Sequence, residues 1–116
     1  MAQLWELSAV EAVGLLRGRK VSPAEMVTAA AARIAAMEPR INALPIRFIE
    51  VALAEAKAMP SKTSEHPGWL AGLPIAVKDY NDVGGQLTTC GSPIFAEHIA
   101  AADDRTVATL RRQGAI

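Results

Sequence analysis

The sequence has one cysteine, Cys90, among its 116 residues. An intramolecular disulfide is therefore impossible, and a metal site built from several cysteines is excluded. Neither sign of charge is in excess, because 12 Lys and Arg balance 12 Asp and Glu. A balanced charge provides no electrostatic footprint for nucleic acid or for an anionic membrane surface. These absences predict a protein of a reducing compartment whose partners bind at a shaped site.

Long apolar runs and a basic leader are also missing. No stretch approaches the roughly 18 residues that a membrane span needs. The first residues, MAQLWELSAVEAVGLL, carry Glu6 and Glu11 but no basic segment of the kind that opens a signal peptide. We therefore predict a cytoplasmic protein that does not bind membranes. Its 51% hydrophobic residues exclude a disordered chain, and its length suits one ordinary domain or part of one.

Helices are predicted over most of residues 1–60. Two capping boxes, in which a serine and a glutamate three residues later each satisfy a free backbone N–H, predict helices that begin at residues 9 and 23. The first is expected to end at residue 17 with Gly18 as its left-handed C-cap, and the second to stop at Pro39. Apolar residues at helical spacing predict a third helix from Ile49 to the neighbourhood of Pro60.

The remaining elements are predicted from shorter signals. Residues 41–48 contain Pro45, so they form either an edge strand or an extended connector. A loop is expected at about residues 60–70. The apolar run at residues 73–77 is too short for a helix and predicts a buried strand. After it, Asp103 or Asp104 is expected to cap a last helix that Gly114 closes.

This order predicts an α/β fold in which a helical layer of about residues 1–60 covers the first strand or strands of a mixed sheet. Residues of about 71–116 supply a strand, a turn and a helix. The sheet is incomplete as the sequence stands, because one strand leaves two edges of backbone groups without partners. We expect such edges and the apolar helix faces to drive association into a homo-oligomer.

Several familiar sites can be rejected from spacing. Asp79, Asn81 and Asp82 do not form a calcium-binding EF-hand loop, because Val83 occupies the fifth position and no glutamate stands at the twelfth. His66, His98 and Cys90 do not have the spacing of zinc ligands, and Gly84–Gly85 lacks the Gly-Lys-Ser/Thr ending of a phosphate loop. No metal and no cofactor is predicted.

Lys78 is the residue with the clearest chemical potential, since it ends the apolar run at residues 73–77. Two interpretations are open: a solvated strand end, or a lysine drawn into an apolar pocket. Burial of that kind lowers a lysine pKa by up to roughly 3–5 units, so that the neutral amine can act as a base.

Two ordered stretches carry a family resemblance: GLPIAVKDYNDVGGQLTTCGSP, which contains Lys78, and DDRTVATLRRQGAI, which closes the sequence. Together with the capped helix SPAEMVTAAAARI they resemble the amino-terminal part of the amidase signature family. Members of that family are serine hydrolases that cleave carboxamides with a Ser, cis-Ser, Lys triad. The resemblance implies a small-molecule amide substrate for the complete enzyme.

By position, Lys78 matches the family's catalytic lysine, which takes a proton through the bridging cis-serine so that the nucleophilic serine attacks the amide carbon. Asp79, Thr88, Thr89 and Ser92 match positions near that lysine and could orient it. Their alternative interpretation is that of turn-forming side chains that bond the backbone.

The resemblance also implies what these 116 residues lack. The family's glycine- and serine-rich segment, with the cis-serine, the nucleophile and the oxyanion donors, is not among them, so we expect the chain alone to be inactive. Two alternatives remain open. The chain could be a non-catalytic oligomerisation or regulatory module derived from the fold, or part of the glutamine-hydrolysing subunit of a tRNA amidotransferase.

Overall fold

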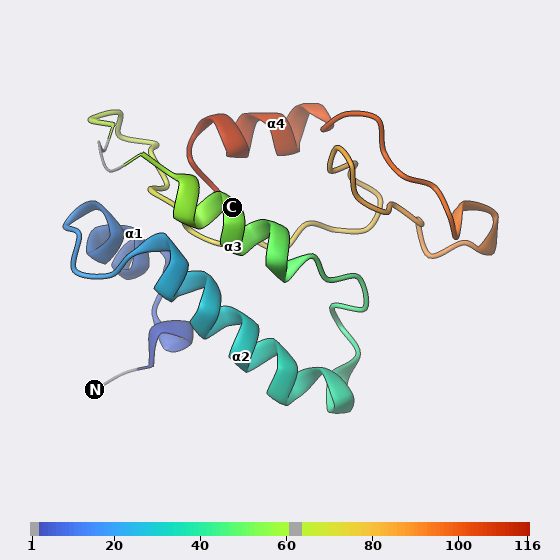
Figure 1. Cartoon of the computed structure of the whole chain (residues 1–116), viewed down its shortest axis with the longest axis horizontal. Helices are drawn as coiled ribbons and strands as arrows, with labels where there is room; N and C mark the ends of the chain where they lie inside the picture. The colour runs from blue at the N-terminus through green and yellow to red at the C-terminus, as the bar shows by residue number, and fades with distance from the viewer. Residues whose placement is uncertain (1–2, 61–63) are drawn as a thin grey trace.

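The computed structural model describes residues 3–60 and 64–116, and helices dominate it (Figure 1). Residues 61–63, within the loop predicted at about 60–70, lie outside the described residues. The elements are, in chain order, the 3₁₀ turn η1 (Leu4–Glu6), helices α1 (Ala9–Arg17), α2 (Pro23–Ile41) and α3 (Ile49–Ala58), the 3₁₀ turn η2 (Pro93–Phe95) and helix α4 (Arg105–Arg112).

Both predicted capping boxes are present. The Ser8 hydroxyl accepts a hydrogen bond from the Glu11 N–H at 3.3 Å, and the Glu11 carboxylate accepts one from the Ser8 N–H at 2.8 Å. Ser22 and Glu25 repeat this arrangement at 3.2 and 2.8 Å. Hydrogen bonds from the Ser8 hydroxyl and N–H lower the pKa of Glu11, and those from the Ser22 N–H and hydroxyl lower the pKa of Glu25.

We predict that Ser22→Ala lowers the free energy of unfolding by about 1 kcal/mol, because it removes the N-cap of the longest helix. Urea unfolding followed by circular dichroism is the measurement. Thr28→Ala is the matched control, since its hydroxyl donates to the Ala24 carbonyl inside the same helix at 2.7 Å and caps nothing. Equal losses in the two variants would contradict the prediction.

Helix α1 ends at Arg17 with Gly18 as its C-cap, as predicted, but the predicted left-handed conformation of that cap was wrong. Gly18 is not left-handed, with φ at −76°, and Arg19 adopts the positive φ of 54° instead. The Arg19 and Lys20 N–H groups donate to the carbonyls of Leu16 and Leu15, which satisfies the last carbonyls of the helix one residue later than predicted.

Helix α2 runs through Pro39 to Ile41, so the prediction that it stops at the proline was wrong. A proline removes its own N–H and its ring crowds the carbonyl four residues earlier, but the residues after it can still donate. The N–H of Asn42, which is left-handed with φ at 46°, donates to the Glu38 carbonyl at 2.9 Å and closes the helix. The segment from there to α3 is an extended connector rather than an edge strand.

The α/β prediction was wrong: residues 3–60 and 64–116 are mostly helical and contain no β-strand. Residues 73–77 are extended, but only Ile116 pairs with them among the described residues. Ile75 donates to the Ile116 carbonyl at 2.8 Å, and Ile116 donates to the Leu73 carbonyl at 3.0 Å. One paired residue does not make a ladder, because a strand needs a neighbour of several residues to satisfy its backbone.

The core lies where α1, the start of α2 and the segment around Trp69 meet. Helix α2 also packs against α3 and η1, and the Arg33 guanidinium lies 4.1 Å from the centroid of the Trp5 ring, which ties η1 to α2. The core cluster consists of Ala12, Leu16, Met26 and Ala71, with Leu4, Leu7, Val21, Trp69 and Leu73 packed against it.

Among the described helices, none combines the length and the apolar composition that crossing a bilayer requires.

Candidate functional site

Lys78 lies at the end of the extended segment, immediately before a turn. Its carbonyl accepts the Asn81 N–H at 2.9 Å, and its side chain is exposed. The Lys78 Nζ is 5.0 Å from the centroid of the Tyr80 ring, a distance at which an ammonium is attracted to an aromatic face. Tyr80 was missed from the sequence, where its only signal is an aromatic residue two positions after the lysine.

The turn after Lys78 is held by Asp79. Its Oδ1 accepts the Thr89 N–H at 2.7 Å and its Oδ2 accepts the Thr89 hydroxyl, while its carbonyl accepts the Cys90 N–H at 2.8 Å. The Thr89 hydroxyl also accepts the Gly91 N–H at 3.2 Å. Hydrogen bonds from the Thr89 hydroxyl and then from its N–H lower the pKa of Asp79. The structure therefore brings Asp79 and Thr89 together directly beside Lys78.

The other two predicted residues make different contacts. Thr88 is buried, and its N–H donates to the His98 carbonyl at 2.9 Å. The Ser92 hydroxyl accepts the Ile94 N–H at 3.3 Å and caps η2. In the described structure both residues order the segment beyond the turn, whereas Asp79 and Thr89 fix the turn itself.

We predict that Thr89→Val raises the pKa of Asp79 toward its ordinary value of 3.8, because valine keeps the shape and the N–H of threonine but loses the hydroxyl donor. Carboxyl NMR titration of Asp79 measures this change. Thr28→Val is the control, since its hydroxyl lies in α2 and bonds Ala24. An unchanged Asp79 titration in Thr89→Val would contradict the prediction.

The same bond has a pH dependence of defined sign. The pKa of Asp79 is lower in the folded chain than the ordinary value, so its carboxylate stabilises the fold above about pH 3.8 and loses that contribution as the pH falls through the folded pKa. The stability difference between the native chain and Thr89→Val is therefore expected to shrink on acidification below that pH.

Residues 86–100 form a projecting arm, which Figure 1 draws in tan and orange at one end of the molecule. Its two sides pair through an antiparallel bridge between Leu87 and Ile99, and its base is closed by the Gly85 N–H, which donates to the Ala100 carbonyl at 2.8 Å. Behind the base, Asp103 accepts the Gly84 N–H at 2.8 Å and Asp104 caps α4 through the Val107 N–H. Of the two predicted caps, Asp104 is the one used.

The described residues contain no group of three or more His, Cys, Asp and Glu side chains that could hold a metal ion. His66 accepts the Gly68 N–H on its Nδ1 at 3.0 Å, and His98 lies 3.9 Å from an Asp82 oxygen. Cys90 is exposed and free.

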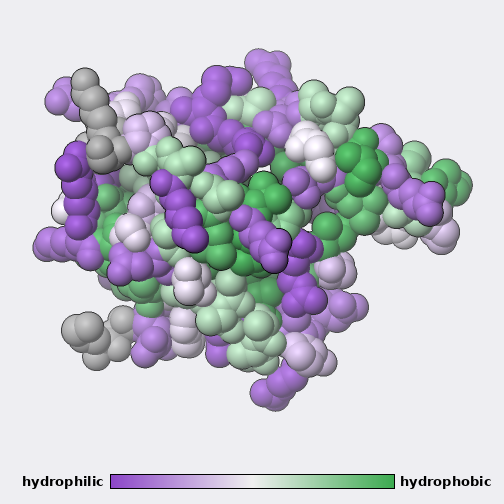
Figure 2. Space-filling view, viewed as in Figure 1, coloured by the Kyte–Doolittle hydropathy of each residue, from purple (hydrophilic) through white to green (hydrophobic). Residues whose placement is uncertain are grey.

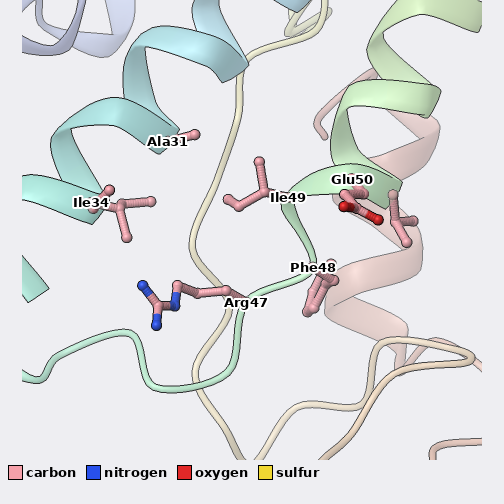
Figure 3. Close-up of a pocket in the computed structure, with 8 residues that line it drawn as sticks. Ala31, Ile34, Arg47, Phe48, Ile49 and Glu50 are labelled. Carbon is pink, nitrogen blue, oxygen red and sulfur yellow. The ribbon is translucent and has the colours of Figure 1, made fainter.

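Among the described residues, two of the best-formed hollows lie away from Lys78, which lines neither of them. One of about 430 Å³ lies between α2 and the start of α3, with Ala31, Ile34, Arg47 and Ile49 around it (Figure 3). The other, of about 310 Å³, lies beside Trp69 and Met59. Lys78 is exposed and contributes to neither of these two hollows.

The comparisons with known proteins decide the family. A family model described as Amidase matches residues 25–116. This chain belongs to the amidase family. The resemblance read from the Lys78 and Thr89 motifs is thereby confirmed.

The relatives of the amidase chain include proteins with two different names. It is 35% identical, over 98% of its length, to a glutamyl-tRNA(Gln) amidotransferase subunit of Carboxydothermus hydrogenoformans, and covers 24% of that protein. It is 32% identical, over 97% of its length, to the indoleacetamide hydrolase of Bradyrhizobium diazoefficiens, and covers 22% of it. The chain thus spans about a quarter of the length of these relatives.

A solved structure agrees with this assignment. It belongs to work on a vestigial protein complex that reveals the evolutionary origins of an s-triazine catabolic enzyme. The amidase chain superposes on it with a TM-score of 0.80 at 34% identity, and covers 95% of itself and 25% of that chain. The helical arrangement described above is therefore similar to one quarter of a known protein.

Proposed function

We propose that this chain is the amino-terminal segment of an amidase that hydrolyses a carboxamide, and that Lys78 is its catalytic base. The observation that carries the proposal is the fixed turn at Lys78. Asp79 is bonded to Thr89 on one side of the lysine, and the extended segment that leads to it is held by Ile116 on the other. A base needs a defined position before it needs a perturbed pKa.

In the proposed reaction the Lys78 amine takes a proton through a bridging serine from the nucleophilic serine. The serine oxygen bonds to the amide carbon, the carbon–nitrogen bond breaks, and the departing nitrogen leaves with a proton as ammonia or an amine. Water then hydrolyses the acyl ester to the carboxylate. Both serines and the oxyanion donors come from parts of the family domain that these residues do not contain, so the isolated chain is expected to show no turnover.

A second candidate function is glutamine hydrolysis within a tRNA amidotransferase. The similar proteins from Carboxydothermus hydrogenoformans and Oleidesulfovibrio alaskensis support it, because both are named as glutamyl-tRNA(Gln) amidotransferase subunits. Both candidates use the same lysine and differ in the amide that is cleaved. The alternative to these two enzymatic functions is a non-catalytic module that forms a homo-oligomer. Light scattering tests it, since a monomer at micromolar concentration contradicts the oligomer.

A chimera tests the proposed function. Residues 1–116 replace the matching segment of the indoleacetamide hydrolase of Bradyrhizobium diazoefficiens, and ammonia release from indoleacetamide is measured. We expect hydrolysis by the chimera and none by the isolated chain. A chimera that is folded by circular dichroism but inert would contradict the proposal. Exchange into the amidotransferase relative, with glutamine as the substrate, compares the two candidates.

A further inference from the structure

The tip of the arm exposes large apolar side chains. Ile94 is 87% exposed and Phe95 44%, and both lie in η2. Ile99, on the returning side of the arm near its base, is 57% exposed. Figure 2 shows hydrophobic residues at this projecting end of the molecule, with hydrophilic residues among them. Single exposed apolar residues are ordinary, but two adjacent ones at the end of a projection form a patch that water solvates poorly.

The tip is ordered by its own hydrogen bonds. Ser92 caps η2, the His98 N–H donates to the Phe95 carbonyl at 3.0 Å, and the rings of these two residues meet edge to face with centroids 6.1 Å apart. An apolar surface that is already fixed loses little conformational entropy when a partner covers it. The tip therefore has the properties of a docking surface rather than those of a loose loop.

The arm is also fixed relative to Lys78. Thr89, near the start of the arm, bonds Asp79 through both its N–H and its hydroxyl, and His98, on the returning side, lies 3.9 Å from an Asp82 oxygen. A partner bound to the tip is therefore held at a fixed position relative to Lys78. Because the arm is bonded to the turn at the candidate site, the expected partner is one that also contributes to that site.

We propose that the tip, Ile94 and Phe95, is the docking surface for the part of an amidase domain that these 116 residues do not contain. The occupant follows from size and similarity, since the chain superposes on one quarter of a solved relative with a TM-score of 0.80. The remaining three quarters of such a domain covers the tip with apolar side chains and brings its serines to Lys78. This inference rests on the proposed function for the role of those serines.

Hydroxyl-radical footprinting read by mass spectrometry tests the docking surface without a substitution. Ile94 and Phe95 are expected to be oxidised in the isolated chain and at least about tenfold less in the indoleacetamide hydrolase chimera. Val10 is the internal control, because it is 83% exposed on α1, far along the chain from the arm, and is expected to be oxidised in both.

A second measurement uses variants of the chimera. Ile94→Ser is expected to lower its Tm, because a buried isoleucine loses apolar contact, while Val10→Ser leaves the Tm unchanged. Equal oxidation of the tip in both proteins, or equal Tm values for the two variants, would overturn the proposal. Protection of the tip already in the isolated chain would overturn it too, since a second copy would then be the occupant.

These outcomes separate the two proposals. An active chimera with an oxidised tip leaves the proposed function standing and removes the docking surface. An inert chimera with a protected tip contradicts the proposed function and supports the docking surface.

Discussion

Lys78→Ala is expected to lower amide hydrolysis by the chimera by about 10²–10⁴-fold, which is the usual contribution of a positioned general base. The loss should fall on kcat rather than on KM, because a base acts in the transition state and not in binding. Lys57→Ala is the matched control, since Lys57 is an exposed lysine in the last turn of α3. Its activity is expected to equal that of the parent chimera.

Lys78→Arg distinguishes a base from a positive charge. Arginine keeps the charge and much of the length of lysine but cannot give up its proton in a protein. We therefore expect Lys78→Arg to be as inactive as Lys78→Ala. Activity retained in the arginine variant would show that the position supplies charge alone, and the role of Lys78 as base would be wrong.

Local signals in the sequence predicted local structure well. The capping boxes at Ser8 and Ser22 were confirmed because each involves partners only three residues apart, and the start of α4 was predicted to within the choice between Asp103 and Asp104. One local detail was wrong. Arg19 took the left-handed position instead of Gly18, since two backbone donors were satisfied one residue later.

Longer-range structure was not available from the same signals. An apolar run such as residues 73–77 predicts a strand only if a neighbour of several residues pairs with it, and here Ile116 is its one partner among the described residues. For the site, the motif placed Asp79 and Thr89 near Lys78, and the structure joins those two directly. The sequence did not show that Tyr80 would lie beside the lysine, because a turn decides that contact.

The second large effect is expected from a substitution at Gly114, which packs against the Trp69 ring. Its φ is +82°, and a Cβ at this position would lie 2.6–2.8 Å from three atoms of the Trp69 ring. We expect Gly114→Ala to lower the free energy of unfolding by about 2–5 kcal/mol, from roughly 1–2 kcal/mol for a left-handed alanine and 1–3 kcal/mol for overpacking against a rigid ring. Urea unfolding measures the change.

Gly85→Ala separates the two contributions, since its φ is +79° and no described atom lies within 4 Å of a Cβ built there. It is expected to show only the backbone cost, and a loss as large as that of Gly114→Ala would contradict the steric explanation.

The substitution at Gly114 is also expected to disturb the position of Lys78. The Gly114 carbonyl accepts the Gly72 N–H at 2.7 Å, and the same end of the chain pairs with Leu73 and Ile75. A Cβ that pushes Gly114 away from Trp69 therefore loosens the segment that positions Lys78, so Gly114→Ala in the chimera is expected to lower kcat as well as stability, whereas Gly85→Ala retains more of both.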